Sequence, residues 1–244
     1  MIIRLTPRNK ALIALHITVF LWGITAILGK LISYSSLTLV WHRMTITFIV
    51  YLLFPSFWRQ VKLLSWLNIC KFFGIGLIVC AHWIFFYASI KIGDSASITL
   101  ACMGSISFFS SIIEPLLMNK PYSILDIGLG LIVIIGILFI YFSLPKDNNS
   151  ESHSTSIANP QLAIITGLIA SFLSSLFCVL NKRLIDLTSP LVMSGLGTYV
   201  YILHCNHYTR IHIICTLSYA MLYCIYTRTY ILYILVYYTI LHYT

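Results

Sequence analysis

Apolar and polar residues follow one another along this chain in long blocks. Apolar runs of about 20 residues, the length that a helix needs to cross a bilayer, recur between short polar segments. These blocks predict helices at about 11–29, 37–54, 70–90, 95–118, 122–143 and 161–181, with a seventh helix beginning near Pro190. The longest polar segment, LPKDNNSESHSTSIANP at 144–160, is rich in Asn, Ser and Pro and predicts a solvated loop.

The composition sharpens this picture. The 244 residues are 59% hydrophobic and 9% charged, whereas a soluble domain carries about 25% charged residues. The mean hydropathy is +0.94. The chain is therefore predicted to be an all-α polytopic membrane protein whose main partner is the lipid bilayer. The net charge of +9 does not indicate nucleic-acid binding, because in a membrane protein the useful quantity is where the basic residues lie.

The distribution of basic residues predicts the orientation. Cytoplasmic loops of membrane proteins carry an excess of Lys and Arg. With the N-terminus in the cytoplasm and alternating spans, nine basic residues lie inside: Arg4, Arg8, Lys10, Arg59, Lys62, Lys71, Lys120, Lys182 and Arg183. Three lie outside: Lys30, Lys91 and Lys146. We therefore expect a multi-pass protein with a cytoplasmic N-terminus.

Two segments of the chain resemble each other. FLWGITAILGKL at 20–31 and FLSSLFCVLNKR at 172–183 share Phe, Leu, a small residue, Leu and Lys at a constant offset of 152 residues. Apolar helices share letters easily, so chance is the alternative explanation. The second copy lies five predicted helices further along the chain than the first, so it begins on the opposite side of the membrane. Inverted repeats of this kind are typical of transporters.

A further set of segments points to a known family. WGITAILGK, LVWHRM, AHWIFFYASIKIGDSASITLACMG, FSSIIEPLLMNKP and LGLIVIIGILFIY together resemble the EamA-type transporters of the drug/metabolite transporter superfamily. The resemblance covers roughly residues 11–194. It implies two inverted five-helix repeats, the first complete at 11–143 and the second partial at 161–194. It also implies export of small metabolites or drugs across the bacterial inner membrane. We expect no cofactor, and we leave open whether two copies of the chain form a homodimer.

Candidate substrate-binding residues are polar or aromatic groups inside predicted spans, where a charge is costly and usually faces the bundle interior. Arg43 resembles the family's arginine in the second helix and either attracts an anionic solute or snorkels to the interface. His82 and its neighbour Trp83 form either a cavity wall with one titratable group or a hydrogen-bonded packing contact. The full set of candidates is Trp22, Arg43, His82, Trp83, Thr99 and Ser105.

The fourth predicted helix is rich in small hydroxyl residues, which either pack helices closely or line a path. Thr99 and Ser105 are the candidates for the path. Glu114, near the cytoplasmic end of the same helix, either carries a coupling proton or pairs with Lys120. In the fifth helix, Gly128, Ile132 and Gly136 recur every four residues, so we expect these glycines to form a close-packing seam.

The last fifty residues, 195–244, differ from the rest. They contain no Phe, Trp, Lys, Asp or Glu, but 11 of the 16 Tyr. Segments such as CIYTRTYI at 224–231 alternate as translated purine–pyrimidine repeats would. We expect this tail to be either an out-of-frame translation or a fused repeat sequence, with the family-like sequence ending near Ser194. A non-functional truncated remnant of a transporter is therefore the main alternative to an active carrier.

Two further chemistries have candidate residues in this chain, metal binding and catalysis. Cys205, His207, His212 and Cys215 supply ligands that zinc favours, but their spacing matches no finger or knuckle, so no metal is expected. The chain shows no nucleophile constellation, phosphate-binding loop or paired carboxylates, so it is not expected to be an enzyme. An intramembrane enzyme that uses the His and Glu of the spans is the weaker alternative.

Overall fold

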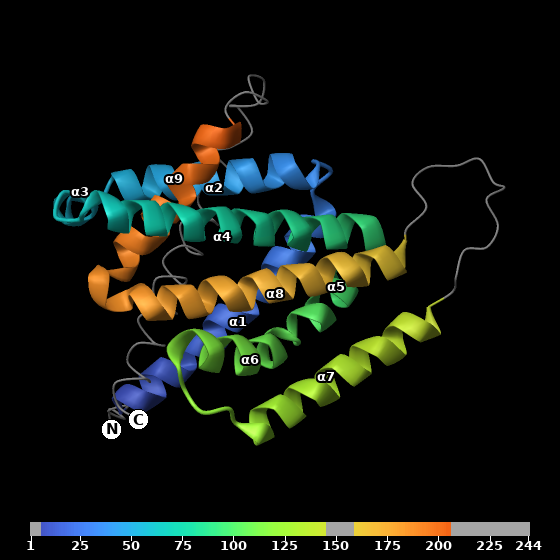
Figure 1. The fold of residues 1–244 in the computed structure, drawn as a ribbon. Coiled ribbons are helices and arrows are strands. Elements are labelled where there is room, and N and C mark those ends of the chain that lie inside the picture. The colour runs from blue at the N-terminus through green and yellow to red at the C-terminus, as the bar shows by residue number, and fades with distance from the viewer. Residues whose placement is uncertain (1–5, 145–158, 206–244) are drawn as a thin grey trace, which may run out of the picture. The chain divides into compact units, whose positions relative to one another are not determined.

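The computed structural model describes residues 6–144 and 159–205, and every regular element within those ranges is a helix (Figure 1). The elements, in chain order, are α1 (Pro7–Leu31), α2 (Ser36–Leu52), α3 (Pro55–Val61), α4 (Trp66–Gly93), α5 (Ala96–Met103), α6 (Ile106–Met118), α7 (Ile124–Ser143), α8 (Pro160–Leu184), the 3₁₀ turn η1 (Ile185–Leu187) and α9 (Pro190–Cys205).

Five helical segments within the described ranges are long and apolar enough to cross a membrane: Leu12–Leu31, Trp66–Gly93, Ala96–Met118, Ile124–Ser143 and Pro160–Leu187. The pair α2 and α3 passes the same test together, but it is bent by 89°. These segments confirm the prediction of an all-α polytopic membrane protein. The predicted spans match them to within a few residues, and α9 begins at Pro190 as expected.

The sequence pattern missed a sharp bend after α2. The chain turns at Leu53 and Phe54, and α3 then begins at Pro55. Proline suits this position because the first turn of a helix needs no backbone N–H donor there. Phe57 anchors the short helix, since its ring is buried and stacks with Tyr51 at 6.3 Å.

A second interruption divides the span predicted at 95–118. Here α5 ends at Met103 and α6 begins at Ile106, and Gly104 and Ser105 lie between them. The backbone N–H groups of both residues bond three residues back, to Ala101 and Cys102, as in a tightened 3₁₀ turn. The Ser105 hydroxyl also donates to the Cys102 carbonyl at 2.7 Å, which satisfies a backbone group inside the membrane span.

The described chain divides into two compact units, which we call unit 1 (residues 6–25, 41–76 and 185–205) and unit 2 (residues 26–40, 77–144 and 159–184). In unit 1, α9 packs against α3 and against the beginning of α4. A Cβ atom added to Gly76 would lie 2.6 Å from the Cα of Gly197, so the two backbones approach as closely as two glycines allow. Tyr199 extends the contact, with its ring 5.0 Å from Phe48 and 5.9 Å from Phe73.

In unit 2, α8 lies alongside α5 and α6, and α7 packs against α6 (Figure 1). The face of α8 toward its neighbours carries small residues, buried at Ala163, Gly167, Ala170, Ser171, Ser174 and Ser175. A Cβ atom at Gly167 would meet the Cβ of Cys102 at 2.9 Å. Small side chains therefore let α8 approach α5 closely, as is typical of helix contacts in membranes.

The predicted glycine seam on α7 is wrong. A Cβ atom at Gly128 or at Gly136 would meet no heavy atom within 4 Å, and Ile132 is 65% exposed. The glycine that packs is Gly130, where a Cβ atom would lie 2.6 Å from the Cα of Phe108 on α6. The four-residue spacing identified a helix face correctly, but α7 presents the opposite side, with Gly130, to its neighbour.

Candidate functional site

His82 lies in the middle of α4 and is buried. Its Nδ1 donates a hydrogen bond of 2.8 Å to the carbonyl oxygen of Ala170 on α8. Three aromatic rings surround the imidazole, with centroids 4.9 Å away for Trp83, 5.4 Å for Phe177 and 6.1 Å for Phe86. The bond to Ala170 fixes the ring between two helices.

A pair of buried hydroxyl groups lies further along the contact between α4, α5 and α8. The Ser89 hydroxyl donates to the Ala163 carbonyl at 2.7 Å, and the Thr99 hydroxyl lies 2.7 Å from that of Ser89. Thr99 is fully buried. This sequence-predicted candidate is thus held in a three-helix junction, where its hydrogen-bonding capacity is used by other parts of the protein.

Ser105, the other hydroxyl candidate, lies at the break between α5 and α6 and is also fully buried. The carbonyl oxygen of Cys102 accepts from the hydroxyl of Ser105 and, at 2.6 Å, from that of Ser171 on α8. The Cys102 thiol in turn lies 3.7 Å from the Ile164 carbonyl. The Cys102 carbonyl at the break thus accepts from the hydroxyl of Ser105, within the break, and from that of Ser171, on α8, as well as from the Ser105 backbone N–H.

The same polar seam ends in a cluster of charges. After the pair Ser110 and Ser175, whose hydroxyls lie 2.9 Å apart, Glu114 of α6 accepts from Lys182 of α8 at 2.7 Å. Lys120 donates to the same carboxylate oxygen at 3.1 Å. The pairing of Glu114 with Lys120 that the sequence allowed is present. The sequence analysis did not predict the shorter contact with Lys182. The only signal for this residue was its alignment with Lys30 in the two similar segments.

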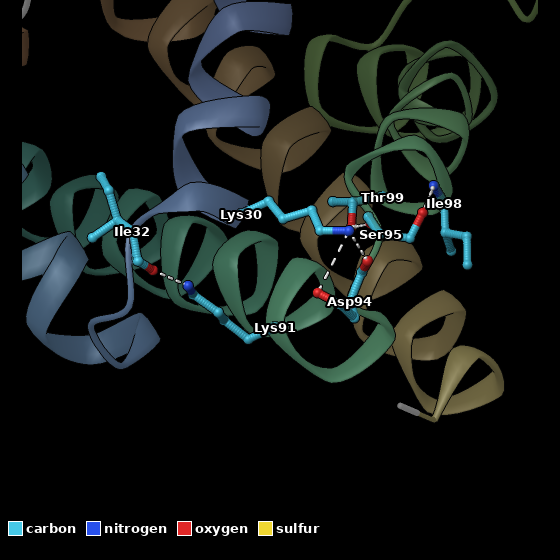
Figure 2. Close-up of polar contacts among 7 residues, drawn as sticks. All are labelled: Lys30, Ile32, Lys91, Asp94, Ser95, Ile98 and Thr99. Atoms are coloured by element: carbon cyan, nitrogen blue, oxygen red, sulfur yellow. Dashed lines mark hydrogen bonds and ion pairs between the residues drawn. The ribbon is translucent and has the colours of Figure 1, made fainter. Parts of the chain in front are cut away.

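The opposite end of unit 2 carries a second cluster (Figure 2). Lys30, in the last turn of α1, lies 3.5 Å from the Asp94 carboxylate and donates to the Asp94 carbonyl at 2.6 Å. Lys91, in the last turn of α4, donates to the carbonyl of Ile32. Each lysine thus binds the backbone at the C-terminal end of the other helix, where carbonyl groups and the helix dipole favour a cation.

The remaining candidates belong to unit 1. Arg43 is buried in α2, and the hydroxyl of Thr47 donates to its carbonyl at 2.8 Å. Trp22 belongs to α1, but its side chain lies outside the described part of the structure. The structure thus brings His82 and Trp83 into contact. Thr99, Ser105 and Glu114 lie in α5, in the break after it and in α6, the two helices that pack against α8. Arg43 and Trp22 belong to unit 1.

Among the described residues, no group of three or more His, Cys, Asp or Glu side chains could hold a metal ion. The cluster at Cys205, His207, His212 and Cys215 is not among them. Cys205 closes α9, but its side chain and the other three residues lie outside the described part. The expectation on zinc therefore stays a prediction.

Apolar helices of spanning length, joined by an internal seam of hydroxyls and ending in charge clusters, define a polytopic α-helical membrane protein. The model of the EamA-like transporter family matches residues 9–142, more than half of the chain, and the protein belongs to that family. This confirms the resemblance found in the sequence. No curated protein and no solved structure matches the chain. The family consists of transporters, not enzymes.

Proposed function

We propose that this protein exports small metabolites or drugs across the bacterial inner membrane, with its N-terminus in the cytoplasm. Membership of a transporter family supports the general activity. The excess of basic residues on one side of the predicted spans supports the orientation. Four parts of the proposal go beyond membership of the family: the substrate class, the direction of transport, the bacterial inner membrane and the orientation of the N-terminus.

The observation that carries the proposal is the position of His82. A polar ring buried within a spanning helix is costly unless its nitrogen atoms have hydrogen-bond partners, and such residues usually mark functional sites. Its partner is the Ala170 carbonyl, so the ring links α4 to α8. In the predicted repeat arrangement, these helices belong to different repeats, whose interface is where transporters of this design bind their substrates.

The other candidate residues take complementary roles in this proposal. Trp83, with its ring beside that of His82, offers an apolar face to the solute. Thr99 and Ser105 hold the helices in place through the hydrogen bonds of their buried hydroxyl groups. Trp22 is a further contact for the solute, and Arg43 attracts an anionic group. Glu114 is the candidate for coupling, because protonation of its carboxylate would weaken its bonds to Lys182 and Lys120.

The test is export from living cells that produce this chain. Mass spectrometry compares the culture medium of producing cells with that of cells carrying an empty vector. We expect one or more small metabolites to accumulate in the medium of the producing cells. His82→Ala is expected to abolish this accumulation. His82→Asn, whose amide can keep the bond to Ala170, separates a loss of packing from a loss of the imidazole.

The chain offers a matched control in His16. Its Nδ1 also lies 2.8 Å from a carbonyl oxygen, that of Leu12, but the side chain is exposed on α1. His16→Ala is expected to leave the accumulation unchanged. Identical media from producing and vector cells would contradict the proposed transport. Equal loss in the His82 and His16 variants would contradict the assignment of His82.

A further inference from the structure

The two charge clusters of unit 2 lie at opposite ends of the same helix. The backbone N–H of Asn159, just before α8, donates to the Ile92 carbonyl at 2.8 Å, so α8 begins beside Asp94 and Lys30. Lys182 lies in the last turn of α8. More than twenty residues of helix separate them, about 30 Å at 1.5 Å per residue, the thickness of a bilayer core.

The cluster at the beginning of α8 is a reciprocal clasp between α1 and α4 (Figure 2). Lys30 of α1 binds the carbonyl of Asp94, just beyond the end of α4, and Lys91 of α4 binds the carbonyl of Ile32, just beyond the end of α1. The ion pair of Lys30 and Asp94 adds to this exchange. The Lys30 and Asp94 side chains are 45% and 74% exposed, so water competes for the pair and the clasp can open.

The cluster at the end of α8 joins different helices. Lys182 of α8 and Lys120, beyond α6, converge on one oxygen of Glu114. The Lys182 and Glu114 side chains are 12% and 25% exposed, so solvent screens this pair less than the pair at the other end. This contact ties α8 to α6, just as the clasp ties α1 to α4.

The sequence connects the two clusters. Lys30 and Lys182 occupy equivalent positions of the two similar segments, 152 residues apart. Each lies in the last turn of its helix. Lys30 pairs with Asp94, just beyond the end of α4, and Lys182 pairs with Glu114 of α6. Because α1 ends where α8 begins, the equivalent lysines lie at opposite ends of the unit.

From this relationship we propose that the Lys30–Lys91–Asp94 clasp and the Glu114–Lys182 ion pair form two alternating locks, one for each end of the transport path. The structure has both locks closed. Opening of one end breaks its lysine contacts while the lock at the other end stays closed. This inference rests on the proposed transport function, since only a carrier needs two ends that open in turn.

The experiment is hydrogen exchange of the full-length chain in lipid nanodiscs, measured by mass spectrometry. Two regions report on the locks: residues 28–35, which hold the Ile32 carbonyl, and residues 115–123, which hold Lys120. Asp94→Asn removes one charge and keeps a residue type that tolerates the left-handed backbone of Asp94, at φ 45°. Glu114→Gln removes the negative charge from the other lock. Asp126→Asn, at the exposed beginning of α7, is the matched control.

We expect Asp94→Asn to raise exchange at 28–35 by about threefold to fivefold, the range for a solvated ion pair. We expect Glu114→Gln to raise exchange at 115–123 by about tenfold, because it loses two charge-assisted hydrogen bonds. In each variant, exchange at the opposite end should fall. Lys91→Gln, which leaves the Lys30–Asp94 ion pair intact, should repeat the pattern of Asp94→Asn.

Two results would overturn the inference. Increased exchange only at the mutated end, with the other end unchanged, would make the clusters independent structural clamps. Increased exchange at both ends would indicate general loss of structure. Because the readout is exchange and not flux, a chain that moves no solute but shows reciprocal exchange would contradict the proposed function and leave the locks in place.

Discussion

Glu114 and Lys182 are joined by an ion pair of 2.7 Å between α6 and α8, and their positions in the sequence are 68 residues apart. Lys120 shares the same carboxylate oxygen at 3.1 Å. One acidic residue therefore holds two basic residues at one end of unit 2. The two lysines differ in exposure, 12% for Lys182 and 46% for Lys120, and this difference can be measured.

Lys182→Met is expected to lower the free energy of unfolding by about 1.5–3 kcal/mol, because a poorly hydrated carboxylate loses its shorter charged hydrogen bond. Lys120→Met is the matched control and should change it by less than about 1 kcal/mol, since the lysine is half exposed. Thermal unfolding of both variants in the same detergent gives the order. Equal shifts in melting temperature would contradict the difference that we assign to burial.

Gly130→Ala is expected to destabilise the protein by about 1–3 kcal/mol, because the new methyl group would press on the backbone of Phe108 in α6. Gly128→Ala and Gly136→Ala, on the same helix, should be neutral or stabilising by up to about 1 kcal/mol, since the added methyl groups meet nothing and alanine favours a helix. Melting temperatures of the three variants decide. The reverse order would support the seam of Gly128 and Gly136 that the sequence predicted.

In unit 1, Gly76→Ala should force α4 and α9 apart, because its methyl group would overlap the backbone of Gly197. A loss of about 1–3 kcal/mol is expected. Gly74→Ala, two residues away on the same helix, adds its methyl group to open space and serves as the control. Limited proteolysis after Pro190 should accelerate in the Gly76 variant alone. Unchanged cleavage in both variants would argue against the close contact of α4 with α9.

Arg43→Gln should reduce export of an anionic solute more than export of a neutral one, because the buried guanidinium would no longer attract the negative charge. Arg59→Gln removes an exposed arginine from α3 and should affect both solutes equally little. Rates of appearance in the medium provide the measurement. Equal losses of both solutes in the Arg43 variant would assign Arg43 a structural role.

The orientation is open to labelling with a membrane-impermeant maleimide. A cysteine at position 150 should react in intact cells, whereas one at position 62 should react only after the membrane is opened. The chain without these added cysteines gives the background from its own seven cysteines. A cysteine at 150 that reacts only in opened cells would reverse the predicted topology.

Much of the helical framework follows from the sequence alone. A backbone that crosses lipid must satisfy its own polar groups, so an apolar block of spanning length has to form a helix. For this reason the predicted spans, the membrane class and the start of α9 at Pro190 agree with the structure. The division into repeats, the site residues, the orientation and the tail after Ser194 stay predictions.

The side that each helix turns toward its neighbours was decided only by the tertiary structure. Gly128 and Gly130 are equally good seam residues in the sequence, but only Gly130 meets Phe108. Glu114 had Lys120 nearby in sequence, yet its shorter bond goes to Lys182 from another helix. Hydrophobicity specifies that a segment spans the membrane, but in lipid both faces of such a helix are apolar. Its rotation and its partners therefore depend on close packing and on a few polar contacts between residues far apart in the chain.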